Sequence, residues 1–344
     1  MNQHPDTVDR RLSVAPMMDW TDRHCRAFHR VLTRRALLYT EMAVDQAVIH
    51  GDAPRLIGFD PAEHPVAIQL GGSDPETLAQ ASRIAAEFGY AEINLNVGCP
   101  SDRVQSGKFG ACLMREPELV RDCLIAMRET VNVPVTVKHR LGVDDQKPEA
   151  TLFEFVNIVA QSGVTSFTVH ARKAWLKGLS PKENRDVPPL DYALVHRLKR
   201  ERPDLEIILN GGLIDLAHAL ENRGGLDGVM VGRAAYQTPW ILADADRAIF
   251  SAANPVASPI EVVAAFRPYV EDQLSRGVKL HAVTRHMLGL FAGRPGARKW
   301  RQVLSSEANK PGADWSVTER ALQAVECAPD GRIGPRGALL RTAS

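Results

Sequence analysis

The sequence predicts an α/β protein, a TIM (β/α)8 barrel followed by a small C-terminal helical domain. Short apolar segments alternate with helical patterns over about 240 residues, which is the order of elements in such a barrel. After about Asn254 the strand pattern stops and only helical patterns follow. A doubly wound parallel sheet is the competing interpretation, because periodicity alone does not separate the two folds.

The predicted strands are rich in Val, Ile and Leu, as expected for parallel strands that are covered on both faces. Most of them end at glycine, proline or a polar residue, which commonly terminate strands. In chain order they are Leu12–Met18, Ala36–Met42, Pro65–Gly71, Ala91–Val97, Val133–His139, Ser166–His170, Glu206–Asn210 and Gly228–Val231.

Helical spacing of apolar residues separates these strands. Asp74 before Pro75 suits an N-cap followed by proline in the first turn. We expect a catalytic barrel domain over residues 1–250, a helical domain over 255–330, and a flexible tail over 331–344. The predicted helices include Pro75–Phe88, Pro117–Thr130, Thr151–Ser162 and Tyr192–Glu201, and then Ile260–Arg276, Leu280–Leu290, Arg298–Glu307 and Trp315–Cys327.

Composition excludes several classes of protein. The 344 residues are 44% hydrophobic and 24% charged, which are ordinary globular values. The five cysteines are widely spaced and form no C-x-x-C pair, so we expect no disulfide framework, no zinc site and a cytoplasmic location. The polar N-terminus does not resemble a secretory signal, and no apolar run is long enough to span a bilayer.

Charge is distributed unevenly along the chain. The whole sequence carries a net charge of +1, but residues 254–344 contain 13 lysines and arginines against 8 acidic residues. A basic C-terminal segment is consistent with a polyanionic partner. A solvated basic helical surface explains the same composition.

The most informative segment is Ile93–Pro100, an apolar strand that stops at Gly98 and delivers Asn96 and Cys99 to its C-terminal end. In a TIM barrel the chemistry lies at such strand ends. A thiol there can donate a proton, attack an electrophile, or fill space. No obvious base accompanies Cys99, which argues against a thiolate nucleophile.

Other strand ends are also polar. Lys138 suits either a Schiff base or a positive charge beside an electron-accepting ligand, and Gln69 can bond a ring edge in both directions. His170 can contact a phosphate or act as an acid, unless it is a satisfied core histidine. No acidic cluster is present that a catalytic metal would require, so we expect no metal.

The ends of the last two strands favour a phosphate site. Asn210-Gly211-Gly212 and Gly232-Arg233 follow the seventh and eighth strands. Loops at these positions commonly bind phosphate in this fold, since glycines let backbone N–H groups approach the anion. Each glycine pair taken alone is also explained as an ordinary turn.

Together these motifs resemble the tRNA-dihydrouridine synthase family, and most closely its DusA-type branch. The resemblance spans the whole barrel in order, and residues 173–191 are similar to the DusA-type loop in particular. The basic helical segment is similar to the family's RNA-binding domain. The motifs that carry it are Ala15-Pro16-Met17-Met18-Asp19, Gln69-Leu70-Gly71-Gly72, Ile93–Pro100, Val137-Lys138-His139-Arg140, Val169-His170-Ala171-Arg172, Asn210-Gly211-Gly212 and Val231-Gly232-Arg233.

This resemblance implies FMN at the mouth of the barrel and NADPH (or NADH) as reductant. Uridines in the D-loop of tRNA, at positions 20 and 20a, would be reduced at C5=C6, with Cys99 protonating C5. By motif, the cofactor-binding residues would be Ala15, Pro16, Met17, Gln69, Lys138, His170, Asn210, Gly211, Gly212, Gly232 and Arg233.

The resemblance also implies a tRNA partner, and we expect a monomer. Asn96 would orient the target base, and strand order suggests that Lys138, His170 and Arg172 contact its carbonyls. The other tRNA contacts implied by motif are Lys182, Glu183, Arg185, Arg298 and Arg301. The alternatives are an FMN-dependent barrel reductase of a small pyrimidine or enone, and a non-catalytic tRNA-binding protein.

Overall fold

The computed structural model describes residues 8–326 and divides the chain into two compact units, with the boundary between Ala257 and Ser258. The first unit holds every strand of the described chain, and the described part of the second is helical. The tail predicted over residues 331–344 lies outside the described residues.

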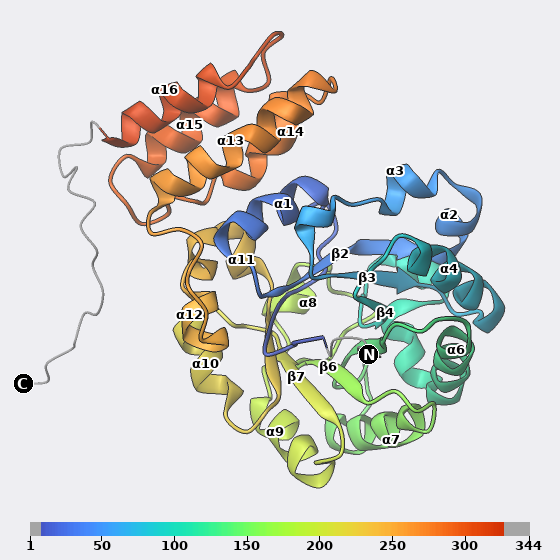
Figure 1. The fold of residues 1–344 in the computed structure, drawn as a ribbon. Coiled ribbons are helices and arrows are strands. Elements are labelled where there is room, and N and C mark those ends of the chain that lie inside the picture. Colours follow the sequence, from blue (N-terminus) through green and yellow to red (C-terminus); the bar gives the residue numbers. More distant parts are fainter. Residues whose placement is uncertain (1–7, 327–344) are drawn as a thin grey trace, which may run out of the picture. The chain divides into compact units, whose positions relative to one another are not determined.

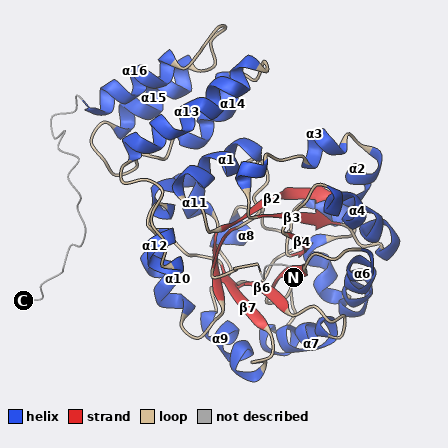
Figure 2. Ribbon diagram, viewed as in Figure 1, coloured by secondary structure: helices blue, strands red, loops and turns tan. Residues whose placement is uncertain are grey.

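The strands of the first unit form a closed barrel in which every neighbouring pair is parallel (Figures 1 and 2). Closure joins the last strand to the first, with Ser13 opposite Met230. This confirms the predicted barrel and excludes the doubly wound sheet. The strands are β1 Leu12–Val14, β2 Leu37–Val44, β3 Val66–Gly71, β4 Glu92–Val97, β5 Val135–Arg140, β6 Ser166–His170, β7 Glu206–Asn210 and β8 Gly228–Val231.

Helices surround the barrel and follow most of its strands (Figure 1). Several begin with an aspartate cap; Asp74 accepts the backbone N–H of Thr77 ahead of Pro75, as predicted. The α-helices are α1 Arg23–Leu32, α2 Asp45–His50, α3 Ala53–Ile57, α4 Pro75–Glu87, α5 Asp102–Ser106, α6 Pro117–Thr130, α7 Pro148–Ala160, α8 Glu183–Asp186, α9 Tyr192–Glu201, α10 Leu216–Arg223, α11 Arg233–Gln237 and α12 Ala245–Phe250. Short 3₁₀ turns are η1 Pro61–Glu63, η2 Gly110–Arg115 and η3 Pro239–Leu242.

The interior of the barrel is apolar on one side and polar on the other. A buried apolar cluster combines Ala15, just after β1, with residues of β2, β3, β7 and β8, among them Tyr39, Ile208 and Met230. The alternate positions of β4 instead carry Glu92, Asn94 and Asn96, all of them buried. Buried polar side chains must find hydrogen-bond partners, so this side of the barrel is a connected network.

Some predicted boundaries are wrong. β1 ends at Val14 rather than Met18, because Pro16 has no N–H to donate to a neighbouring strand. The helix predicted over Leu280–Leu290 is a short α-helix, α14 Leu280–Thr284, followed by a 3₁₀ turn, η4 Arg285–Met287. Gly289 and the β-branched pair Val283-Thr284 lower helix propensity in this segment.

The second unit also contains α13 Pro259–Ser275, α15 Ala297–Glu307 and α16 Ser316–Glu326. Its core includes Trp300, which is fully buried, donates its indole N–H to the carbonyl of Met287 at 3.0 Å and packs edge-on against Phe291. No helix within residues 8–326 combines the length and apolarity that crossing a bilayer requires.

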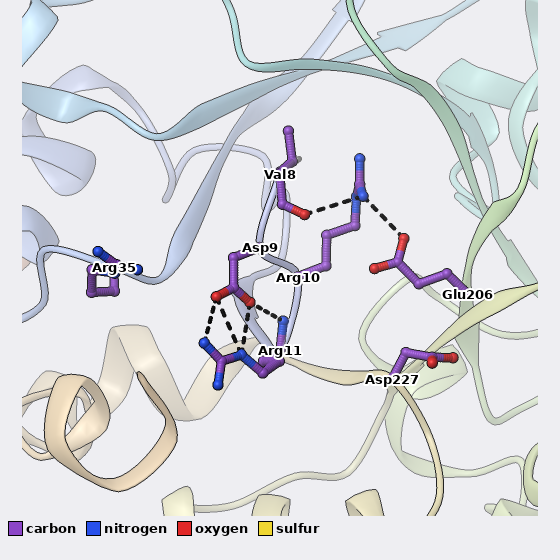
Figure 3. A pocket seen from close by; sticks show the side chains of 7 residues that line it. All are labelled: Val8, Asp9, Arg10, Arg11, Arg35, Glu206 and Asp227. Carbon is purple, nitrogen blue, oxygen red and sulfur yellow. Dashed lines mark hydrogen bonds and ion pairs between the residues drawn. The ribbon is translucent and has the colours of Figure 1, made fainter. Parts of the chain in front are cut away.

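A polar pocket of about 870 Å³ lies at the floor of the barrel, where the strands begin (Figure 3). Arg10 enters this floor and pairs with Glu92 at 2.6 Å and Glu206 at 3.0 Å. Because barrel chemistry lies at the opposite ends of the strands, this pocket is not the candidate active site.

Candidate functional site

Cys99 lies on a tight turn directly after β4, at the mouth of the barrel. The side-chain oxygen of Asn96 accepts the backbone N–H of Gly98 at 3.1 Å and that of Cys99 at 3.0 Å. The thiol is half-buried, and its nearest polar contact is the hydroxyl of Ser101 at 3.5 Å. The turn therefore fixes the backbone position of Cys99, and its half-buried thiol can reach a ligand in the barrel mouth.

Arg140 clamps the same turn from the end of β5, a role that sequence reasoning missed. Its guanidinium donates to the carbonyl of Gly98 at 2.8 Å and to those of Lys173 and Asn184 at 3.0 Å. Burial and the neighbouring arginines lower its pKa to about 10, while the nearby Cys99 raises it. Arg140 therefore ties the Cys99 turn to the loop that follows β6.

Lys138 points into the mouth from β5. Its ammonium makes no hydrogen bond or ion pair with the side chains that the structure describes, which leave out those of residues 102 and 103. Burial, and then the charge of Arg140, lower its pKa to about 7, although the nearby Cys99 acts to raise it. A half-buried ammonium without a carboxylate favours an anionic or electron-rich ligand beside it.

His170, at the end of β6, is held next to the glycine turn after β7. A side chain at Gly211, where φ is +109°, would meet the His170 ring at 2.6 Å. Burial and the charges of Arg140 and Lys138 put the pKa of His170 well below its ordinary value. The imidazole is thus neutral at physiological pH, with one N–H to donate and one nitrogen to accept.

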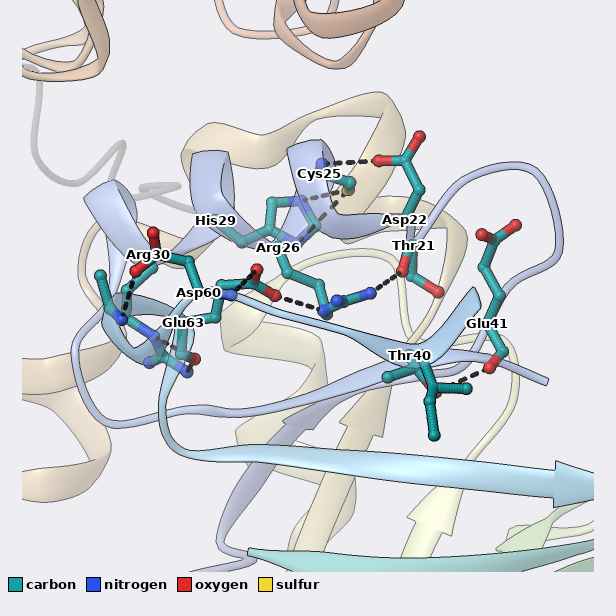
Figure 4. A network of polar contacts seen from close by, with 12 residues as sticks. Thr21, Asp22, Cys25, Arg26, His29, Arg30, Thr40, Glu41, Asp60 and Glu63 are labelled. Atoms are coloured by element: carbon teal, nitrogen blue, oxygen red, sulfur yellow. Dashed lines mark hydrogen bonds and ion pairs between the residues drawn. The ribbon is translucent and has the colours of Figure 1, made fainter. Parts of the chain in front are cut away.

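The loop after β1 is fixed from outside the barrel. The hydroxyl of Thr21 accepts the N–H of Met17 at 2.9 Å, and the carbonyl of Thr21 accepts from Arg26 at 2.8 Å. Arg26 in turn pairs with Glu63 at 2.6 Å, and both side chains are buried (Figure 4). Met17 and the adjacent Pro16 are half-buried and form one wall of the mouth.

The last two strand ends contribute backbone more than side chains. Asn210 donates its amide to the carbonyl of Met230 at 2.7 Å, which holds β7 to β8. Gly211 and Gly212 both have positive φ. Arg233 pairs with Asp186 at 2.7 Å, so an anion bound here would share that guanidinium with a carboxylate.

Asn96 and Gln69 hydrogen-bond each other below the mouth. Asn96 donates to the side-chain oxygen of Gln69 at 2.7 Å, and Gln69 donates to Asn94 at 2.8 Å. Both side chains are therefore already hydrogen-bonded within the protein. The second N–H of the Gln69 amide has no hydrogen-bond acceptor within the described chain and is left for a ligand.

The loop after β6 brings further cations to the mouth. Arg172 donates to the carbonyl of Pro188, while its buried Nε has no partner among residues 8–326. Lys182, Glu183 and Arg185 are exposed on and beside α8. Arg185 lies close enough to Cys99 and Arg233 for their charges to influence its pKa, which burial lowers first.

The structure brings most predicted site residues to one end of the barrel. Arg298 and Arg301 instead lie on α15 of the second unit, exposed and three residues apart. No group of three or more potential metal ligands occurs in the part of the chain that the structure describes. The residues at or beside the barrel mouth are Ala15, Pro16, Met17, Gln69, Asn96, Cys99, Lys138, His170, Arg172, Lys182, Glu183, Arg185, Asn210, Gly211, Gly212, Gly232 and Arg233.

Comparison with known proteins identifies the family to which the chain belongs. The family model for dihydrouridine synthases (Dus) matches residues 13–326. The chain belongs to the dihydrouridine synthase family. This confirms the resemblance seen in the motifs, and it makes the chain a member of a family of flavin-dependent oxidoreductases.

Several relatives of this dihydrouridine synthase are named tRNA-dihydrouridine(20/20a) synthase. Those from Xanthomonas axonopodis pv. citri and Yersinia pestis are 57% and 58% identical over 316 residues, which cover 92% of this chain and 94% and 91% of theirs. The protein of that name from Escherichia coli K12 is 57% identical, with 92% and 91% coverage.

A solved structure of a 2-naphthoyl-CoA reductase in complex with 2-naphthoyl-CoA shares the fold. The TM-score is 0.51 at 10% identity, over 68% of this chain and 49% of that one. The chain therefore spans about half the length of that reductase, and the likeness supports the barrel alone.

Proposed function

We propose that this dihydrouridine synthase reduces the C5=C6 bond of D-loop uridines in tRNA, at positions 20 and 20a. Relatives of 57% identity over 92% of the chain carry that activity in their names. The observation that carries the proposal is Cys99, a thiol held on a fixed turn at the mouth of a barrel, beside Lys138 and Arg140.

We propose FMN as the flavin, and the donor set of the mouth fits it. Lys138 provides an ammonium without a carboxylate partner, and His170 provides a neutral imidazole. At Gly211 and Gly212 the positive φ would strain any residue with a Cβ, so glycine leaves the backbone N–H groups accessible to a ligand. When bound, FMN would supply the hydride for C6 of uracil, after reduction by NADPH. The residues proposed to hold it are Ala15, Pro16, Met17, Gln69, Lys138, His170, Asn210, Gly211, Gly212, Gly232 and Arg233.

The chain's own residues handle the proton and the charge. Cys99 donates its thiol proton to C5 of uracil as general acid, and the thiolate left behind is stabilised by the nearby Lys138 and Arg140. Arg172 has a buried N–H available for a carbonyl of the base. Asn96 contributes by holding the turn that carries Cys99.

The target uridine must be unstacked from its neighbours in the tRNA to reach the barrel mouth. Holding the tRNA in that state requires contacts to its phosphate backbone. We propose Lys182, Glu183 and Arg185 at the mouth, and Arg298 and Arg301 on α15, as contacts. Both arginines of α15 are exposed, and neither makes an ion pair or hydrogen bond within residues 8–326. The proposed domains are thus an FMN-binding barrel over 1–250 and a tRNA-binding helical domain over 255–330, in a monomeric cytoplasmic enzyme.

Replacing the thiol tests the proposal. Cys99→Ala should keep FMN and tRNA binding and lose turnover by a factor on the order of 10² or more, since a general acid contributes that much. Cys112→Ala removes another half-buried thiol and should keep full activity. Normal dihydrouridine formation by Cys99→Ala would overturn the general-acid assignment.

Mapping dihydrouridine in tRNA from cells that lack this protein tests the substrate. Loss confined to positions 20 and 20a is the expected result. Full modification in those cells, together with a yellow purified protein that is reoxidised by small enones, would indicate the alternative reductase. A colourless protein that binds tRNA would indicate the non-catalytic alternative.

A further inference from the structure

A continuous row of hydrogen bonds runs through the barrel from its floor to the Cys99 turn. The side chain of Glu92 lies at the floor end and is fully buried. One of its oxygens accepts Arg10 at 2.6 Å, and the other accepts the hydroxyls of Tyr39 at 2.5 Å and Thr136 at 2.6 Å.

From Thr136 the row continues upward through three amides. Asn94 donates to the hydroxyl of Thr136 at 2.8 Å, Gln69 donates to Asn94 at 2.8 Å, and Asn96 donates to Gln69 at 2.7 Å. Asn96 then accepts the N–H groups of Gly98 and Cys99. The side chains from Glu92 through Thr136, Asn94 and Gln69 to Asn96 are each at most 8% exposed, so water does not compete for the bonds between them.

The direction of this row is determined at both ends. Backbone N–H groups can only donate, so Asn96 must turn its oxygen to them and its NH₂ to Gln69. The same logic orients Gln69 and Asn94 and leaves the Thr136 hydroxyl to donate to the Glu92 carboxylate. Every donor from the Cys99 turn downward therefore points toward Glu92.

Such a row is cooperative. A group that donates a hydrogen bond to a carboxylate becomes a better acceptor for the next donor, and low surrounding polarity strengthens the effect. Asn96, at the end of the row, is thus a better acceptor for the two N–H groups that position Cys99.

We propose that Glu92 is a positioning residue, which fixes the turn of Cys99 through Thr136, Asn94, Gln69 and Asn96. The inference rests on the proposed function of Cys99 as proton donor. It adds that the position of the thiol is set at the floor of the barrel, by a residue outside the set that is proposed to hold the cofactor.

Thr136 offers the cleanest test, because Thr136→Val removes one hydroxyl with little change of shape. Thr136→Ser keeps the hydroxyl and should restore the parent behaviour. The matched control is Ser166→Ala on β6, one position before the Phe167 that pairs with Val137. Ser166 is buried, and its hydroxyl has no hydrogen bond within the described chain.

Two measurements read out the variants. Amide hydrogen exchange of the flavin-free protein should show protection at Gly98 and Cys99 falling about tenfold in Thr136→Val, since the acceptor weakens. In the flavin-loaded protein, reoxidation by tRNA should slow about tenfold or more, as misplacement of a reacting group by an ångström does, while reduction by NADPH is unchanged.

Unchanged protection or unchanged reoxidation in Thr136→Val, relative to Ser166→Ala, would overturn the proposal. If Thr136→Val does not fold, Asn94→Leu breaks the row one bond nearer to Cys99 and carries the same expectations. Failure of the proposed function is a separate result, because the parent protein itself would then not be reoxidised by tRNA.

Discussion

At the scale of single residues, the mouth of the barrel contains two cations, Lys138 and Arg140, that have no carboxylate partner in the described part of the chain. Lys138 is the extreme case, with burial and Arg140 lowering its pKa to about 7. Its unfolded-state pKa is near 10.4, so the unfolded chain binds more protons between these values. The contribution of Lys138 to the free energy of unfolding is therefore lowest below pH 7 and rises as the pH increases toward 10.

The variant Lys138→Met removes this dependence. In the flavin-free protein, the free energy of unfolding of the parent should rise by about 1 kcal/mol relative to that of Lys138→Met between pH 7 and pH 9. Because the side chain is partly exposed, solvent screening keeps this gain below the value that the full pKa difference would give. Urea unfolding at the two pH values measures the gain. Lys147→Met, at an exposed lysine, controls for loss of charge, and a pH-independent difference would contradict the low pKa.

At the scale of elements, the wall formed by the loop after β1 depends on contacts behind it. Arg26 of α1 joins the carbonyl of Thr21 to Glu63 of η1 (Figure 4). The hydroxyl of Thr21 accepts the N–H of Met17. The pair is buried, so removing one partner leaves an uncompensated polar group. Helix α1 thus supports the shape of this wall of the barrel mouth without entering it.

Arg26→Met should lower the free energy of unfolding by about 3 kcal/mol, because Glu63 stays buried without its partner. The double variant Arg26→Met with Glu63→Gln should lose less, since no charge remains and the glutamine can still accept the N–H of Asp60. Denaturant unfolding of the flavin-free proteins measures both. Equal losses in the two variants would show that the charge of Glu63 does not matter.

At the scale of the whole molecule, the chain combines a barrel with a basic helical unit. The exposed cations of α15 lie on its surface, while Trp300 between them is fully buried. This tryptophan belongs to the core of the unit and presents no face to a ligand. Binding of tRNA by this unit is therefore expected to be electrostatic rather than based on stacking.

The double variant Arg298→Ala with Arg301→Ala should weaken tRNA binding and lower the slope of log K against log salt by roughly 1 to 2, since each phosphate contact contributes just under one. Reduction of the flavin by NADPH should be unchanged. Arg276→Ala with Lys279→Ala removes the same charge elsewhere in the unit as a control. Equal effects of the two pairs would mean that only net charge matters.

Local patterns predicted the fold class and the strand ends, because alternation of apolar strands and helices is a short-range signal. Cys99, Lys138 and His170 were recognisable since each lies at, or just after, the C-terminal end of a strand. The clamp by Arg140 was not predictable, because its partners Gly98 and Asn184 are 42 and 44 residues away. The burial of Trp300 likewise depends on packing with Phe291, which spacing alone does not reveal.

The one-way row of bonds from the Cys99 turn to Glu92 has a consequence for how this sequence can vary. Replacing one amide by an acid, as in Asn94→Asp, places a carboxylate oxygen against the hydroxyl oxygen of Thr136, and both atoms are then acceptors. Rotating a single side chain cannot restore a donor–acceptor pair with Thr136 and with Gln69 at the same time. Substitutions along the row are then tolerated as matched sets rather than singly. Homologous sequences should accordingly show covariation among positions 69, 94, 96 and 136.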